Sequence, residues 1–249
     1  KKKGSGAGSG SMASLLDELL GLAEDLGRKL YLYAEDKLKK NAAKEDGQKE
    51  HKVEKIVYAS SSMAYGEFNN KVPDETVVPK PNTLYGSYKR QVEIMCKIWH
   101  REHDLNYVIM RPSAVYGTRD TITRVISKLL KSVLTTGKMN VQGPDNKLDF
   151  SYVEDVAEYF TLATTNEVIN ETFNCTRGNG RKIIEAAEII KSKLGTGEIT
   201  TTPHDPFYPS RDTLNSDKAK TMLNFNPSVD IEEGIPKYIN WFLGQPFYF

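Results

Sequence analysis

Two side chains four residues apart, Tyr85 and Lys89, have the types and the spacing that suit proton transfer. On a helix they share one face, because residues i and i+4 lie one turn apart. A phenol is a poor base at neutral pH, but a neighbouring ammonium stabilises the phenolate. With a serine hydroxyl on the same substrate oxygen, such a pair can move a proton on or off a sugar hydroxyl while a hydride leaves the same carbon.

The elements that must position these side chains form a βαβ unit. Residues 55–59 are typical of a buried strand and lead into three serines at 60–62. A helix is predicted over 85–103, and a second strand over 107–110 leads into residues 111–117. This order predicts a parallel sheet, in which chemistry gathers at the carboxyl ends of the strands. A Tyr-x-x-x-Lys pair alone is more often a solvated helix surface; the serine-rich strand end favours a site.

Five segments occur in the order that one protein family uses. The sequence resembles the extended short-chain dehydrogenase/reductases, and within them the NAD-dependent nucleotide-sugar epimerase/dehydratase family, from about Val53 to Trp241. The segments are residues 57–66 (VYASSSMAYG), Tyr85 with Lys89, residues 111–117 (RPSAVYG), residues 148–156 (LDFSYVEDV) and residues 172–175 (TFNC).

The resemblance implies a role for several residues, with NAD as cofactor and a nucleotide sugar as substrate. Tyr85 takes the place of the catalytic acid or base, Lys89 that of the residue that binds the nicotinamide ribose and tunes the tyrosine, and Ser61 that of the catalytic serine or threonine. Tyr85 and Lys89 would also contact the cofactor. The remaining expected contacts are Pro112 and Ser113 to the cofactor, and Ser61, Ser62, Ala114 and Arg211 to the substrate.

Departures from the family pattern limit which reaction of the family is expected. Family dehydratases carry an Asp-Glu pair after the catalytic serine or threonine, and here the pair is Ser62-Met63, which favours an epimerase. Leu148 and Ala114 stand where many members have a substrate-binding Arg and Asn, so no single sugar nucleotide is implied. Arg211 is the candidate phosphate ligand, because a guanidinium matches phosphate in a bidentate manner; a solvated surface arginine is the alternative.

The N-terminal part departs most from the family. Residues 1–12 have linker or tag-like Gly/Ser composition, with a Gly-rich phosphate loop as the alternative. Residues 13–52 predict an atypical helical segment that is too short for a complete βαβαβ half. The first strands are therefore expected to be shortened, replaced or missing. Two functions follow: an NAD-dependent epimerase, or a scaffold protein that has lost its cofactor half.

The sequence as a whole predicts an α/β fold. A Rossmann-like catalytic core is expected over 53–165 and a small C-terminal α/β substrate-binding region over 166–249, with a possible homodimer or a partner chain completing the sheet. Further helices are expected over 121–136, 154–165, 181–194 and 231–242, and further strands over 139–141 and 172–175.

The composition is that of an ordinary soluble globular protein. Hydrophobic residues make up 39% of the chain and charged residues 27%, and the net charge is +1. This balance gives no argument for nucleic acid or a membrane as partner. Two cysteines, Cys96 and Cys175, make neither a disulfide framework nor a metal site, and no secretory signal is present, so a cytoplasmic protein without bound metal is expected.

Overall fold

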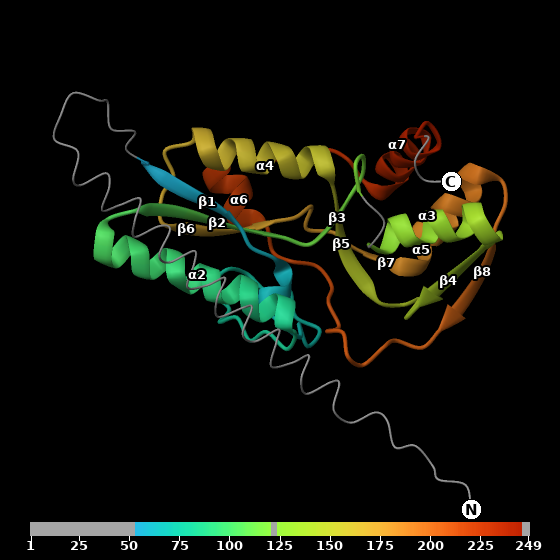
Figure 1. Cartoon of the computed structure of the whole chain (residues 1–249), viewed down its shortest axis with the longest axis horizontal. Coiled ribbons are helices and arrows are strands. Elements are labelled where there is room, and N and C mark those ends of the chain that lie inside the picture. The colour runs from blue at the N-terminus through green and yellow to red at the C-terminus, as the bar shows by residue number, and fades with distance from the viewer. Residues whose placement is uncertain (1–52, 121–123, 246–249) are drawn as a thin grey trace, which may run out of the picture. The chain divides into compact units, whose positions relative to one another are not determined.

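The structure, a computed structural model, describes residues 53–120 and 124–245 (Figure 1). The expectations for the linker-like residues 1–12 and for the helical segment 13–52, including the fate of the first strands, lie outside these ranges. Among the described residues, no helix combines the length and the apolar character needed to cross a lipid bilayer.

The first sheet is parallel and holds the strands that the sequence predicts. Its order is β1-β2-β6, with β1 at Lys55–Ala59, β2 at Asn106–Pro112 and β6 at Glu171–Cys175. Val57 lies opposite Val108, and Val108 lies opposite Glu171. Central strand β2 has a buried apolar run at 107–110, as expected for a strand covered on both faces. The α/β fold with a Rossmann-like parallel sheet is confirmed.

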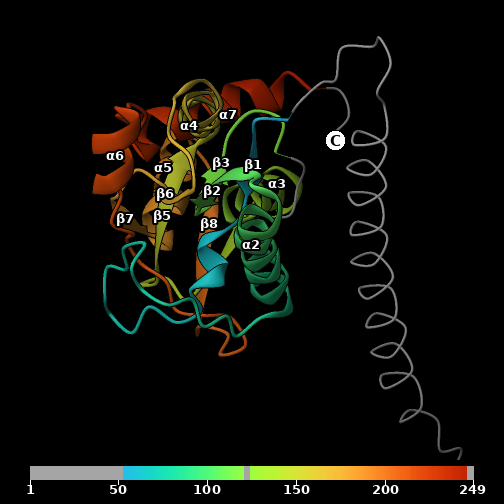
Figure 2. The same cartoon turned by 90° about the vertical axis from the view of Figure 1, so that its left-hand side faces the viewer.

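Helices cover both faces of this sheet (Figures 1 and 2). Side chains of β2 alternate between the two faces, because successive residues of a strand point to opposite sides. Tyr107 and Ile109 pack with Cys96 of α2 (Leu84–His103). Val108 and Met110 pack with Tyr159 of α4 (Val153–Thr165) and with α6 (Asp217–Leu223), in a cluster that also holds Phe173 of β6 and Phe225.

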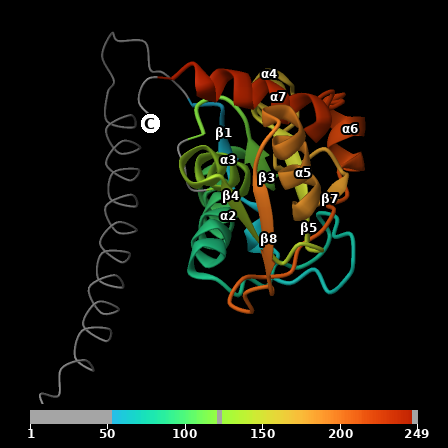
Figure 3. The ribbon, with the colours of Figure 1, turned by 90° about the vertical axis from the view of Figure 1, so that its right-hand side faces the viewer.

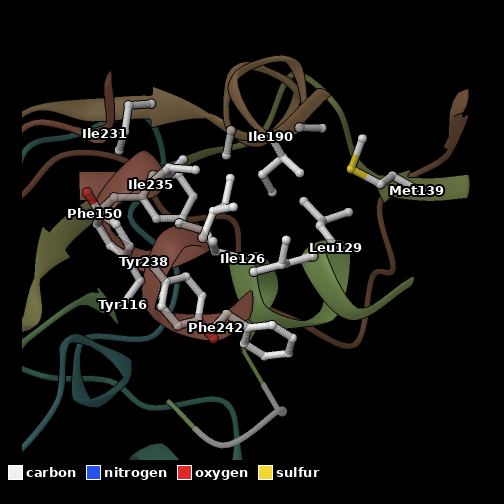
Figure 4. Packing of buried hydrophobic residues seen from close by; sticks show 14 of the residues in the cluster. Tyr116, Ile126, Leu129, Met139, Phe150, Ile190, Ile231, Ile235, Tyr238 and Phe242 are labelled. Atoms are coloured by element: carbon white, nitrogen blue, oxygen red, sulfur yellow. The ribbon is translucent and has the colours of Figure 1, made fainter. Parts of the chain in front are cut away.

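A second group of elements surrounds the largest hydrophobic cluster (Figures 3 and 4). Its strands are β3 (Ala114–Tyr116), β5 (Lys147–Tyr152) and β7 (Gly180–Lys182) in one sheet, and β4 (Lys138–Gln142) with β8 (Glu198–Thr202) in another; its helices are α3 (Val125–Thr136), α5 (Ile183–Leu194) and α7 (Ile231–Leu243). Ile126, Ile190 and Tyr238 come from the three helices and meet in this cluster. The α/β character expected of the C-terminal part is thus present.

The two groups of elements interleave along the chain. β6 follows residue 166 yet completes the first sheet, whereas β3 and β5 precede residue 165 and belong to the second group. The expected division at 165 is therefore not the boundary between the sheets. The helix predicted over 121–136 begins at Val125, because Arg124 is its N-cap and has an extended backbone, and the helix predicted from 181 begins at Ile183, after β7.

A buried ion pair fixes α2 against the first sheet. The Glu93 side chain is 0% exposed and that of Arg111, at the end of β2, is 2% exposed. Arg111 donates from Nε to Oε1 at 2.8 Å and from Nη2 to Oε2 at 2.7 Å. The Ser60 hydroxyl, just after β1, donates to Glu93 Oε1 at 2.6 Å. Burial opposes ionisation of Glu93, but the hydrogen bonds and charge of Arg111 outweigh it and hold the pKa of Glu93 below its usual range.

We expect Glu93→Ala to lower the free energy of unfolding by about 3–5 kcal/mol, because it leaves the Arg111 guanidinium buried without a counter-charge. Chemical denaturation followed by circular dichroism measures this. The matched control is Glu102→Ala, which removes the exposed partner of Arg101 on the same helix and should cost less than about 1 kcal/mol. Equal losses in the two variants would contradict the role given to the buried pair.

Candidate active site

The carboxyl ends of β1 and β2 bring the predicted serines together. Because Ala59 lies opposite Met110 in the parallel register, the segments that leave the two strands start side by side. The segment after β1 forms the short 3-10 helix η1 (Ser62–Ala64), and the segment after β2 carries Ser113. The Ser62 hydroxyl donates to Ser113 Oγ at 3.3 Å, so a predicted substrate contact and a predicted cofactor contact lie at one point.

The first turn of α2 presents Tyr85 at this edge. Thr83 is the N-cap, and its hydroxyl accepts from the Gly86 N–H at 3.1 Å. A Cβ on Gly86 would lie 2.3 Å from the carbonyl oxygen of Met63, so only glycine lets this turn approach η1 so closely. Tyr85 itself is 53% exposed, and its ring is therefore accessible to a ligand.

Lys89 lies one turn further along α2 and is fixed to the end of β1. Its Nζ donates to the carbonyl oxygen of Ala59 at 2.8 Å. The same Nζ lies 5.6 Å from the ring centroid of Tyr85 and 5.5 Å from that of Tyr58, within the range of cation–π attraction. The predicted shared face of Tyr85 and Lys89 is therefore present, with the ammonium between two phenol rings.

Ser61 is buried and belongs to the turn itself. Its hydroxyl oxygen accepts from the Met63 N–H at 3.2 Å and so caps η1. Among the hydrogen bonds of the described residues, none joins Ser61 to Tyr85. Its catalytic role stays a prediction, whereas the adjacent Ser62 makes the contacts that connect this turn to the rest of the site.

Arg211 comes from a segment far along the chain and also reaches this point. Its Nη1 donates to Ser62 Oγ at 3.3 Å. Within the described ranges no carboxylate forms a salt bridge with it. Burial lowers the pKa of Arg211, and the only opposing influence is the nearby Tyr85 phenol. A partly buried cation without a counter-charge is costly in a folded protein, and an anionic ligand would relieve that cost.

Pro112 and Ala114 flank Ser113 where β2 ends and β3 begins, and both are partly buried. Their place at the carboxyl end of β2 agrees with the expected positions of cofactor and substrate contacts. Their roles stay predictions.

The sequence reasoning missed Glu93, whose buried ion pair holds the helix that carries Tyr85 and Lys89. Glu93 follows Tyr85 and Lys89 at the same four-residue spacing, so all three lie on one face of α2. The sequence did contain a signal for Glu93: a carboxylate on the helix face that packs against the sheet is buried, and a buried carboxylate is generally paired with a cation.

Comparison with known proteins identifies the family. The model of the NAD dependent epimerase/dehydratase family matches residues 41–176, more than half of the 249 residues. A UDP-glucose 4-epimerase of Thermus thermophilus, solved in complex with NAD, is 26% identical, with a TM-score of 0.71 over 77% of this chain and 65% of that one. A UDP-glucose 4-epimerase of Thermotoga maritima, solved with UDP-glucose, is 28% identical, with a TM-score of 0.72 over 76% of this chain and 63% of that one.

The relatives also include a dTDP-D-glucose 4,6-dehydratase of Mus musculus, 28% identical over 215 residues, which are 81% of this chain and 58% of the relative. The chain spans about 60% of the length of the curated relatives it matches. The family match, the order of the motifs and the parallel sheet agree, and the chain belongs to the NAD dependent epimerase/dehydratase family.

Proposed function

We propose that this chain belongs to an NAD-dependent nucleotide-sugar epimerase that acts through a 4-keto sugar intermediate. The observation that carries the proposal is the meeting of three groups at the strand ends: the accessible Tyr85, the Ser62 hydroxyl and the Arg211 guanidinium, which no carboxylate of the described residues neutralises. A nucleotide sugar offers a hydroxyl for the phenol and a diphosphate for the guanidinium. The activities in the names of the relatives support the same class of reaction.

The described residues fit the nicotinamide end of NAD. Two polar groups lie at the strand ends. The Lys89 ammonium lies beside the accessible Tyr85 ring, and the Ser113 hydroxyl accepts a hydrogen bond from Ser62. When bound, NAD would supply the acceptor and donor for the hydride of the sugar carbon. The Gly-rich candidate for the pyrophosphate falls in 1–12, outside the described residues.

The chain's own residues would act on the proton and on the position of the sugar. The Tyr85 phenolate takes the proton from the sugar hydroxyl, and the phenol returns it after the sugar has presented its other face. Lys89, whose Nζ lies 5.6 Å from the centre of the Tyr85 ring, would contact both the tyrosine and the nicotinamide ribose. Ser61 and Ser62 are the hydroxyls that we expect to hydrogen-bond the sugar oxygen, and Arg211 neutralises part of the charge of the diphosphate.

An epimerase is favoured over a 4,6-dehydratase by the residues beside the serines. Elimination of water needs an acid and a base near the sugar, and here Ser62 and Met63 supply neither. The mouse dehydratase among the relatives shows that both reactions occur in the family. The scaffold alternative gains no support, since the family match and the site geometry both favour an enzyme.

The proposal extends to the assembly and the compartment. Within the described residues, β1 pairs only with β2, and the exposed face of α2 carries Leu84, Tyr88, Ile94 and Ile98. An open strand edge beside exposed apolar side chains supports the expected homodimer, or partner chain that completes the sheet. The free thiols of Cys96 and Cys175 support a reducing compartment such as the cytoplasm.

We expect Tyr85→Phe to lower kcat for the interconversion of UDP-glucose and UDP-galactose, with NAD⁺ added, by roughly 100- to 10,000-fold. The ring remains, so calorimetry should show little change in UDP binding. Tyr88→Phe is the matched control, because Tyr88 lies exposed on the same helix outside the site. Undiminished turnover in Tyr85→Phe would remove Tyr85 from the mechanism.

We expect Arg211→Ala to raise KM for the nucleotide sugar by about tenfold with a smaller effect on kcat, because it removes a contact shared by ground and transition states. Arg211→Lys should recover only part of the loss, since an ammonium lacks the bidentate geometry. Arg101→Ala, on the exposed part of α2, is the control. An unchanged KM in Arg211→Ala would assign Arg211 to the solvated surface.

We expect light scattering of the purified chain to give at least twice the mass of one chain. Ile94→Lys together with Ile98→Lys should restore a single chain, because the added charges oppose burial of the exposed face of α2. A single-chain mass for the unaltered protein would contradict the homodimer.

A further inference from the structure

Asp149 of β5 is a fully buried carboxylate that accepts hydrogen bonds from the backbone N–H groups of two distant segments. It is 0% exposed. Oδ2 accepts from the Leu214 N–H at 3.1 Å, and both carboxylate oxygens accept from the Gly178 N–H at 3.2 Å. Among the described residues, no lysine or arginine forms a salt bridge with it. The charge is therefore stabilised by the main chain of two segments that are distant in sequence.

One of these segments is the one that carries Arg211. Leu214 follows Arg211 by three residues, and the residues between them are held at the same place. The Gly180 N–H of β7 donates to Thr213 Oγ1 at 2.8 Å, and Lys147 Nζ of β5 lies 3.4 Å from Asp212 Oδ2. The Lys147 pair is exposed and contributes little, so the buried Asp149 contact is the strongest of the three.

Keeping a charge on Asp149 is unfavourable for the fold. Burial raises the pKa of Asp149 to about 6, although the hydrogen bond from Leu214 and its other partners oppose the rise. A carboxyl with a raised pKa binds more protons in the folded state, so the stability it contributes falls as pH rises from about 4 to 6. Buried charges that lower the stability of the fold are expected at functional sites, where they hold a segment in position. Asp149 fits this description, because it holds the segment that carries Arg211.

We propose that Asp149 is the positioning residue for Arg211: its carboxylate fixes residues 211–214 against β5, and this sets the guanidinium at Ser62. The inference rests on the proposed function in one respect, because it takes Arg211 to be the group that receives the anionic part of the substrate. Asp149 itself does not touch the ligand and acts only through the segment that it holds.

Asp155 offers a matched control within the same chain. It is also buried, and it also accepts from a distant main chain, the N–H groups of Ser228 and Val229, at 3.2 and 3.0 Å. The segment it holds leads into α7 and not to Arg211. Asp155→Asn therefore reports what loss of a buried, main-chain-bound carboxylate does to the protein when Arg211 is unaffected.

The experiment combines amide exchange with UDP binding, using Asp149→Asn, which keeps the shape and removes the charge. We expect the Leu214 amide to exchange at least tenfold faster by NMR than in the unaltered chain, while amides of β2 keep their protection. Calorimetry should show about a tenfold loss of UDP affinity, and the loss should vanish when Arg211→Ala is already present. Asp155→Asn should leave Leu214 exchange and UDP affinity unchanged.

Unchanged exchange at Leu214, or a loss of UDP affinity that adds fully to that of Arg211→Ala, would overturn the positioning role. Absence of UDP binding by the unaltered chain would instead count against the proposed function, and Leu214 exchange would still decide whether Asp149 holds the segment. If Asp149→Asn does not fold, Gly180→Ala displaces the same segment, because its Cβ would lie 2.5 Å from Thr213 Oγ1. It should then give the same Arg211-dependent loss, and a loss independent of Arg211 would overturn the inference.

Discussion

The buried pair of Glu93 and Arg111 is the interaction on which the site depends. Two charges in a protein interior are tolerated only when they neutralise each other with good geometry. The pair therefore allows α2 only one position and orientation on the sheet. Ser60 extends the pair to the end of β1. Tyr65 extends it further, since its ring lies 4.6 Å from the Arg111 guanidinium and its hydroxyl donates to Asn174 Oδ1 of β6 at 2.9 Å. The ends of all three strands are thereby tied to the helix that carries Tyr85 and Lys89.

Buried polar side chains also hold several loops near the strand ends. In each case one such side chain binds the main chain of a distant segment. Asn174 donates from Nδ2 to the carbonyl oxygens of Pro73 and Asn215. Asp149 and Asp155 accept from distant N–H groups in the same manner. Long loops lack the ladder of hydrogen bonds that fixes a strand, so a few such contacts define their conformation. This explains how a site can be built from segments that have little regular structure.

Residue patterns predicted the elements that have a clear apolar run or repeat and missed several short strands that lack one. The apolar run of β2 and the spacing of α2 are strong signals, and both elements were confirmed within a residue or two. β3 and β7 have three residues each, and the five residues of β8 are mostly exposed threonines, so none carries a readable alternation. In the site, residue types and motifs predicted Tyr85, Lys89 and Arg211, whose roles stay predictions. The turn of Ser61 toward its own backbone and the contact of Ser62 with Arg211 depend on tertiary packing, which spacing alone does not encode.

The position of β6 in the first sheet also has a consequence for how the protein folds. Val108 pairs with Glu171, and between them the chain makes β3, α3, β4 and β5 of the second group of elements and the helix α4. Pairings with such sequence separation form slowly, because the chain loses loop entropy before the contact compensates for it. During synthesis, β1, α2 and β2 leave the ribosome well before β6, and Arg211 emerges later still. A nascent chain therefore holds Tyr85 and Lys89 with one side of β2 unpaired, and Arg211 can reach Ser62 only after β6 has emerged.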